Sequence, residues 1–203
     1  MVYQGTVLSP ILWTVYYSDS CMAVRACNFE EVIFADDLNA FKPFANSVPD
    51  QDVFDQIDRC QAALHKWGRA NGVCFDPAKE SKHILSRSAP VGCSFKILGV
   101  LFDCKLLMHD ALSECAGEGG WRTMCILNCR RCYSTRELIL LYKSHVLSYL
   151  EFRTPAMSHA SSSALSILDA VQSRFLRAVD LSDVDALLFF SLAPLSTRRD
   201  IAI

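Results

Sequence analysis

Short runs of β-forming residues, each bounded by turn residues, predict hairpins in the first half of the chain. One run, Glu30–Lys42, has the adjacent residues Asp36 and Asp37 at its centre, which are suitable residues for a tight turn. Another run, Cys93–Leu106, contains Gly99, and a glycine inside a strand pair indicates a bulge or a close approach of another backbone. The first hairpin, whose aspartates lie between two apolar runs, is expected to be buried.

Two helices are predicted around the first hairpin. The first begins with Ser9 as its N-cap, and its apolar stripe includes Ile11, Val15 and Met22, so we expect it to be buried. The second is a longer amphipathic helix between Pro49 and Gly72, where proline suits the start and glycine the end.

Helical spacing dominates the second half of the chain. Ser134 and Glu137 form a capping box at the start of one helix, and further helices are predicted over 163–179 and 182–190. The glycines of 117–120 are expected to break the helical region that precedes them. The fold class is therefore α+β, with antiparallel hairpins packed on helices in residues 1–107 and an all-α module in residues 108–203.

Composition narrows the function without specifying it. Half of the 203 residues are hydrophobic, yet the apolar runs are too short to span a bilayer and the N-terminus does not resemble a signal peptide. We therefore expect an intracellular protein, in the cytoplasm or nucleus, with no membrane partner. The net charge of −2 does not favour a dedicated nucleic-acid binder, so the basic positions are interpreted as solvated helix faces. Those positions are Arg122, Arg130, Arg131, Arg198 and Arg199.

The ten cysteines are scattered, and reduced thiols are expected. Cys125, Cys129 and Cys132 would share one face of a helix. Packing of that face is the favoured interpretation and zinc binding the alternative, because the paired spacing of a zinc site is absent.

The paired aspartates are the strongest candidate for chemistry. Two carboxylates at a hairpin tip repel each other, so a bound cation would stabilise them. Mg²⁺ prefers one or two carboxylates together with substrate phosphates, which makes Asp36 and Asp37 a candidate site for phosphoryl transfer. A simple polar turn is the alternative.

Four segments follow one another in the first half of the chain: QGTVLSP from Gln4, FADD from Phe34, WGRANGVCFDPAKESK from Trp67 and FKILGVLFD from Phe95. Their order resembles the palm of reverse transcriptases, most closely those of non-LTR retrotransposons. The later segments LYKSHVLSYLEFRTPA and LAPLSTRRDIAI resemble the thumb and the region after it, so the resemblance covers nearly the whole chain.

The resemblance implies a role for individual residues near the chemistry. Gln4 and Gly5 match the turn beside the incoming nucleotide and template. Asp36 matches the catalytic aspartate that binds metal, and Asp37 matches its less critical neighbour. Phe34 and Ala35 precede them, where other reverse transcriptases have different residues, often a tyrosine first.

Two further positions follow from the same resemblance. Lys79 matches the lysine associated with nucleotide approach and proton donation to pyrophosphate, with Lys82 as the alternative in this register. Leu98, Gly99 and Val100 match the hairpin that supports the primer terminus. Trp67 is interpreted as a packing residue of the long helix rather than a base-stacking one.

The resemblance implies a fragment of an RNA-directed DNA polymerase that uses Mg²⁺, an RNA template, a DNA primer and deoxynucleotide triphosphates. In that family a further metal-binding aspartate lies on a strand before the Gln-Gly turn, and the fingers region precedes it. Neither is expected here, so the isolated chain should be inactive. An endonuclease domain is expected in the full element. The alternatives are a non-catalytic retroelement remnant and a domesticated module that binds nucleic acid or protein.

Overall fold

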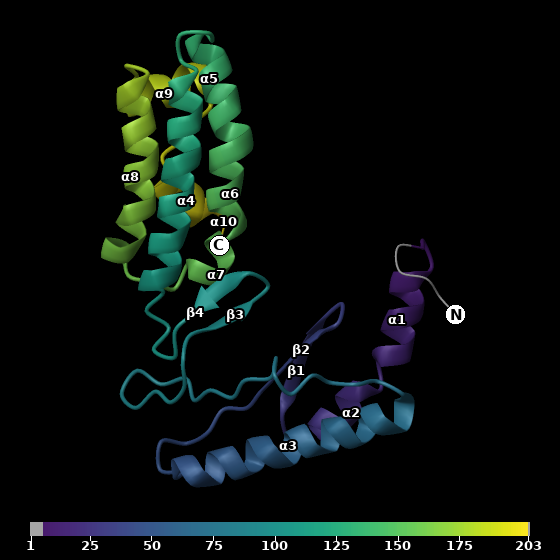
Figure 1. Cartoon of the computed structure of the whole chain (residues 1–203). Helices are drawn as coiled ribbons and strands as arrows, with labels where there is room; N and C mark the ends of the chain where they lie inside the picture. Colours follow the sequence, from purple (N-terminus) through teal and green to yellow (C-terminus); the bar gives the residue numbers. More distant parts are fainter. Residues whose placement is uncertain (1–5, 203) are drawn as a thin grey trace. The chain divides into compact units, whose positions relative to one another are not determined.

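The computed structural model describes residues 6–202 and divides into two compact units, one up to Lys82 and one from His83 (Figure 1). Its described residues form helices and two small antiparallel hairpins, which agrees with the α+β class. None of the helices within this range is long and apolar enough to cross a membrane. The first unit contains α1 (Ser9–Tyr17), α2 (Ser20–Arg25), β1 (Glu30–Phe34), β2 (Asp37–Phe41) and α3 (Asp50–Asn71).

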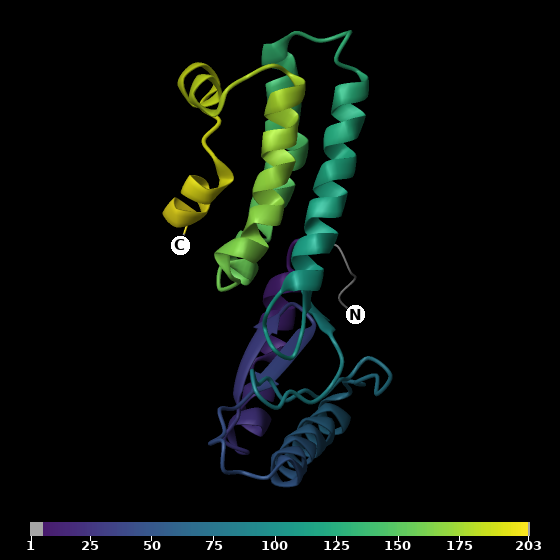
Figure 2. The same ribbon diagram turned by 90° about the vertical axis from the view of Figure 1, so that its left-hand side faces the viewer.

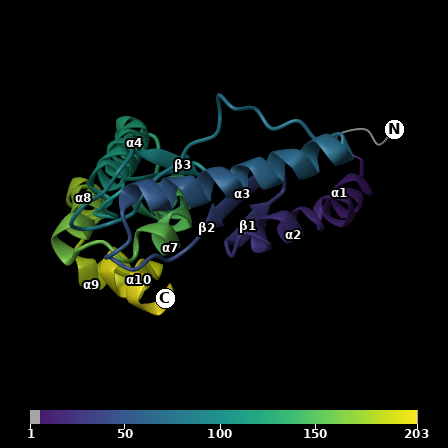
Figure 3. The same ribbon diagram turned by 90° about the horizontal axis from the view of Figure 1, so that it is seen from below.

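The long amphipathic helix is confirmed as α3. It ends at Gly72, whose φ of 70° lies in the left-handed region that favours glycine. Helix α2 lies along α3 (Figure 3). The buried side chains of Val24, Phe29 and Cys60 form a small core between these elements.

The predicted buried helix from Ser9 to Met22 is wrong in two respects. The chain breaks between α1 and α2, and the apolar stripe is exposed, with Ile11 at 62% and Val15 at 69%. Tyr17 is buried instead. Ser9 is also the first helical residue rather than a side-chain cap. Periodicity identified an apolar face, but the described part of the first unit supplies little surface to cover it.

The hairpin of β1 and β2 is confirmed as a hairpin but not as a buried one. Val32 and Phe34 are both exposed. In the part of the chain that the structure describes, β1 pairs only with β2, so the sheet has two strands and two open edges. An isolated hairpin is marginally stable in water, and open apolar edges favour association.

The second unit carries the larger core. Helices α4, α5–α6 and α8 stand side by side, and α9 and α10 lie beside α8 (Figure 2). The unit contains β3 (Phe95–Ile97), β4 (Val100–Phe102), α4 (His109–Asn128), α5 (Thr135–Tyr142), the π-helical turn η1 (Lys143–Leu147), α6 (Ser148–Phe152), α7 (Thr154–Met157), α8 (Ser162–Ala178), α9 (Asp183–Phe190) and α10 (Leu195–Ala202).

Specific side chains explain why these helices form and pack. The capping box is confirmed, since the Ser134 hydroxyl accepts from the Glu137 amide and the Glu137 carboxylate accepts from the Ser134 amide. At the centre of the unit, the fully buried rings of Tyr142 and Phe175 stack with their centroids 4.2 Å apart. The hydrophobic positions of α5 and α8 therefore face one another across a shared core.

The expected helix break at residues 117–120 is wrong, because α4 continues through this segment. Gly119 is buried against α6, and a Cβ at this position would lie 2.9 Å from Cδ2 of Leu150. The glycine therefore allows two helices to approach closely. Tertiary packing outweighs the low helix propensity of glycine here.

The observed division of the chain differs from the expected one near Leu107. Strand β4 contacts α4, and Val100 belongs to the core of the helical unit. The second hairpin therefore packs with the helices that follow it.

The carboxylate of Asp103 holds the turn that leads from β4 into α4. Its oxygens accept hydrogen bonds from the backbone N–H groups of Lys105 at 3.0 Å, Leu107 at 3.1 Å and Met108 at 2.7 Å. Partial burial acts to raise the pKa of Asp103, but the N–H donors, with Met108 first among them, lower it below its ordinary value of 3.8.

We therefore expect Asp103→Asn to destabilise the second unit at pH 7. Because the folded-state pKa is lowered, the carboxylate contributes its full stabilisation above about pH 4 and loses it as the pH falls through the folded-state pKa. Urea unfolding should thus show a gap between wild type and variant that closes in acid. Asp110→Asn, in the exposed first turn of α4, is the control. A gap that stays constant with pH would contradict this role.

Candidate functional site

The tip of the first hairpin is a two-residue turn that presents both aspartates to solvent. Phe34 pairs with Asp37, so the turn consists of Ala35 and Asp36 rather than the two aspartates expected from the sequence. Ala35 has a φ of 54°, the sign that the first central position of a type II′ turn requires. Asp36 therefore stands at the tip, and Asp37 begins β2 beside it.

Helix α1 supports this tip through two aromatic residues. The indole N–H of Trp13 donates a hydrogen bond to the Ala35 carbonyl at 2.8 Å. Trp13 stacks on Tyr17 with ring centroids 5.0 Å apart, and Tyr17 meets the edge of Trp67 at 5.4 Å. Trp67 thus has the packing role expected of it. The sequence interpretation missed Trp13 and Tyr17, although their i, i+4 spacing places them on one helix face.

The negative charge at the tip affects the pKa of Tyr17, which lies in the aromatic cluster with Trp13 and Trp67. The hydroxyl of Tyr17 is buried and has no hydrogen-bond partner among the described residues. Burial raises the pKa of Tyr17, and the negative charge of Asp36 raises it further. Tyr17 therefore stays protonated, and its hydroxyl is a donor that faces the field of the Asp36 carboxylate.

The tip residues fit a hard divalent cation only in part. Asp36 and Asp37 offer adjacent carboxylate oxygens, and no ion pair of the described chain uses either of them. Mg²⁺ accepts one or two carboxylates when phosphate oxygens and water complete its six ligands. Within residues 6–202, however, no group of three or more His, Cys, Asp or Glu side chains lies close enough to hold a metal.

Among the described residues, neither Lys79 nor Lys82 has a hydrogen bond or ion pair with Asp36 or Asp37. Gln4 and Gly5 lie outside the described residues. Lys79 is exposed in a turn after α3, where its backbone N–H donates to the Asp76 carbonyl at 3.0 Å. Lys82 is ion-paired with Asp58, so its ammonium is less available than that of Lys79.

The three residues matched to the primer-supporting hairpin belong to the second unit. Leu98 and Gly99 form the turn between β3 and β4 with φ values of 48° and 79°, and Val100 begins β4 and is buried. A Cβ on Gly99 would meet nothing within 4 Å. The expected close backbone approach is therefore absent from the described structure, and the turn itself explains the glycine.

The cysteine face is not packed as expected. Cys125, Cys129 and Cys132 are all exposed, and only Cys125 lies inside α4. No metal-binding group includes them within the described range. The chain leaves α4 after Asn128, so the helical face that would align them is not formed.

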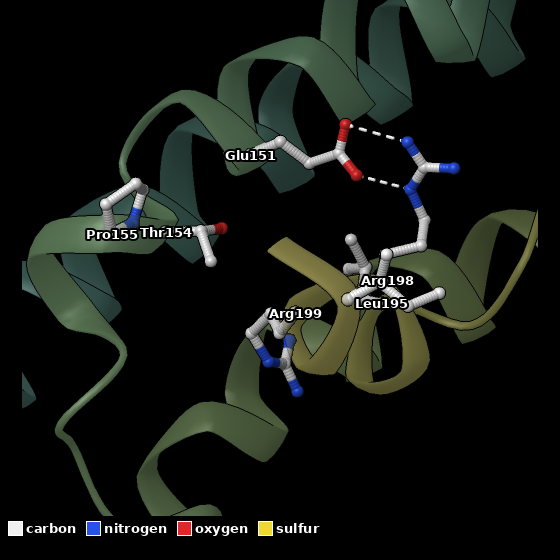
Figure 4. Close-up of a pocket in the computed structure, with 7 residues that line it drawn as sticks. Glu151, Thr154, Pro155, Leu195, Arg198 and Arg199 are labelled. Atoms are coloured by element: carbon white, nitrogen blue, oxygen red, sulfur yellow. Dashed lines mark hydrogen bonds and ion pairs between the residues drawn. The ribbon is translucent and has the colours of Figure 1, made fainter. Parts of the chain in front are cut away.

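The basic residues near the C-terminus line a pocket between α6, α7 and α10 (Figure 4). Arg198 binds both carboxylate oxygens of Glu151, with Nη2 to Oε2 at 3.0 Å. The guanidinium of the buried Arg199 contacts Asp169 at 2.8 and 2.9 Å. Because each arginine has a carboxylate partner, the pocket offers no free positive charge to an anion.

The comparisons with known proteins found no relative for this chain. No family model, no curated protein and no solved structure matches it.

We expect Trp13→Phe to loosen the hairpin tip. The variant keeps an aromatic ring against Tyr17 but loses the N–H donor to Ala35, which is worth roughly 0.5–1 kcal/mol. Amide hydrogen exchange in β1 and β2 should become about two- to fivefold faster. Trp121→Phe, at an exposed position on α4, should leave that exchange unchanged. Equal rates of amide hydrogen exchange in the two variants would show that α1 does not support the tip.

Proposed function

We propose that this chain is a fragment of an RNA-directed DNA polymerase of the non-LTR retrotransposon type, and that the isolated chain is inactive. The order of the four palm-like segments supports the family. The observation that carries the proposal is the pair of exposed carboxylates, Asp36 and Asp37, on a two-residue hairpin turn supported by Trp13.

Asp36 and Asp37 would hold Mg²⁺, with Asp36 as the main ligand. The ion, when bound, would stabilise the charge that develops as a primer 3′ hydroxyl displaces pyrophosphate. The Trp13 N–H, which donates to the Ala35 carbonyl, would keep the tip rigid behind these carboxylates. Lys79 would donate a proton to the leaving pyrophosphate, and its exposed position leaves it free to meet a bound nucleotide. Gln4 and Gly5 would contact template and nucleotide.

The inactivity of the isolated chain follows from the size of the ligand set. Two carboxylates from adjacent residues supply a minority of the six ligands of Mg²⁺, and no third protein ligand stands beside them among residues 6–202. Phosphoryl transfer depends almost wholly on positioning and charge stabilisation. A loosely held ion provides little of either.

The exposed apolar side chains of the first unit favour a second candidate, a non-catalytic module that binds a protein or nucleic-acid partner. Ile11, Val15, Val32 and Phe34 are all solvent-exposed. Large exposed apolar patches mark interaction sites in soluble proteins, so these side chains are candidates for such a contact.

The metal site is tested with Mn²⁺ as a paramagnetic probe. We expect Mn²⁺ to broaden the amide signals of Asp36 and Asp37 in NMR spectra, and the broadening to disappear in the double variant Asp36→Asn, Asp37→Asn. The matched control is Asp50→Asn with Asp52→Asn, which removes the same charge from the first turn of α3. Broadening that follows total charge, and is lost equally in both double variants, would contradict a site at the tip.

The proposed membership of the reverse transcriptase family is tested by sequencing the transcript. Sequencing upstream of Met1 in the same frame should reveal a strand that carries an aspartate. A stop codon or a frameshift in that region would favour the non-catalytic candidate.

A further inference from the structure

Two cysteines face each other at the base of the second hairpin. Strands β3 and β4 pair in a register that matches Phe95 with Phe102. Cys93 and Cys104 each lie two residues beyond this pair, outside the two strands. The Cys104 thiol donates a hydrogen bond to the Cys93 carbonyl oxygen, with Sγ and O 3.4 Å apart, so the two residues are in contact. Both thiols are free.

The pair lies where the strand ladder has ended. Cys93 and Ser94 precede β3 without regular secondary structure, and Cys104 lies in the turn after β4. A disulfide requires Cβ atoms about 3.5–4.5 Å apart. Because no ladder hydrogen bonds of β3 and β4 hold these residues, the contact between them can adjust to that geometry.

The two thiols differ in accessibility, and a histidine lies beside the buried one. Cys93 is exposed, whereas Cys104 is buried. His83 places Nδ1 3.8 Å from the Cys104 sulfur, and its ring stacks on Phe95 at 4.2 Å. Burial lowers the pKa of His83, which keeps the imidazole neutral at pH 7 and leaves one ring nitrogen able to accept a proton.

The Cys104 thiol needs such an acceptor. Burial raises its pKa, and the negative charges of Asp103 and of a Cys93 thiolate raise it further. Cys104 therefore remains a thiol until a base removes its proton, and His83 is the base within reach.

We propose that Cys93 and Cys104 are a modification site that forms a disulfide by exchange with a small disulfide such as oxidised glutathione. The exposed Cys93 thiolate attacks one sulfur of the small disulfide, forms a mixed disulfide and releases one small thiolate. The S–H bond of Cys104 then turns from the Cys93 carbonyl to Nδ1 of His83, which takes the proton, and the Cys104 sulfur attacks the Cys93 sulfur. This step forms the protein disulfide and releases the second small thiolate, which takes the proton from His83. Two protein thiols are oxidised and one small disulfide is reduced to two thiols.

The chain provides an internal comparison. Cys27 and Cys60 also lie together, in the small core beside α3, and burial raises the pKa of Cys60 to about 11. This second pair has no imidazole bonded to either sulfur among the described contacts. We expect it to react more slowly than Cys93 and Cys104.

The experiment treats the full chain with oxidised glutathione, blocks remaining thiols and digests it with trypsin. Cleavage after Arg87, Lys96 and Lys105 places Cys93 in the peptide SAPVGCSFK and Cys104 in the peptide ILGVLFDCK. Mass spectrometry should find these two peptides linked, after an early phase in which glutathione is attached to Cys93. The Cys27 and Cys60 peptides, which trypsin also separates, should be linked later.

Three variants identify the role of each residue. Cys104→Ser should accumulate the glutathione adduct on Cys93, and Cys93→Ser should leave Cys104 unmodified. His83→Asn should form the adduct at the normal rate but resolve it at least about tenfold more slowly, as expected for a lost base. His65→Asn, on α3, is the control and should change neither step.

Two results would overturn the proposal. One is a stable adduct on Cys93 in the wild-type chain without linkage to Cys104. The other is linkage that proceeds equally fast in His83→Asn, which would remove the assigned base. If Cys104→Ser does not fold, the order of adduct and linkage in the wild-type time course still decides between these outcomes.

Discussion

The purified chain, supplied with Mg²⁺, an RNA template, a DNA primer and deoxynucleotide triphosphates, should extend no primer above background. Asp36 and Asp37 provide two carboxylates, and no third ligand joins them among residues 6–202. Electrostatic stabilisation by a positioned group typically contributes about 10²- to 10³-fold to a rate, and a well-held metal contributes several kcal/mol. We therefore expect a loss of at least about 10³-fold relative to an intact polymerase, measured by gel analysis of labelled primers.

The control for this assay is Asp36→Asn, which should be indistinguishable from the wild-type chain. Primer extension that depends on Mg²⁺ and disappears in Asp36→Asn would contradict inactivity and make Asp36 a catalytic ligand. Extension that survives in Asp36→Asn would indicate a contaminating polymerase, and it would be tested again after further purification.

Phe175→Ala should destabilise the second unit by about 3–5 kcal/mol, the usual cost of deleting a buried aromatic ring. Phe175 is fully buried, and its ring stacks on Tyr142 at 4.2 Å, so the substitution leaves a cavity at the contact between α5 and α8. Unfolding in guanidinium chloride, followed by circular dichroism, measures the change for the helical transition.

Phe189→Ala provides the matched comparison on α9. Phe189 is 74% exposed, so the same deletion should change the free energy of unfolding by less than about 0.5 kcal/mol. Equal effects of the two substitutions would show that the stacked pair does not form the centre of the core. A large effect of Phe189→Ala alone would contradict the exposed position of Phe189 on α9.

The features that local sequence decides were predicted well. The capping box of Ser134 and Glu137 requires only residues three positions apart, and it forms as expected. Helix α3 ends at Gly72 for the same kind of reason, since the left-handed backbone there suits glycine. The second hairpin also forms where the pattern predicted a strand pair.

Most predictions that were wrong concern features that depend on partners distant in sequence. Apolar spacing marked the stripe of Ile11 and Val15 and the strand residues Val32 and Phe34, but it does not show whether another element covers them. Gly119 was predicted to break a helix, but it lies inside α4, where the absence of a side chain lets α6 approach closely. The prediction that Cys125 and Cys129 share one helix face was wrong for a local reason, because α4 ends at Asn128.

The candidate site shows the same division. The sequence alone identified Asp36 and Asp37 as an adjacent carboxylate pair in a hairpin, because strand propensity and turn chemistry are properties of short segments. Only the tertiary structure placed Trp13 and Tyr17 behind that tip, and His83 beside Cys104. Such contacts join residues about twenty positions apart, and their formation depends on how whole elements pack rather than on the pattern within any one of them.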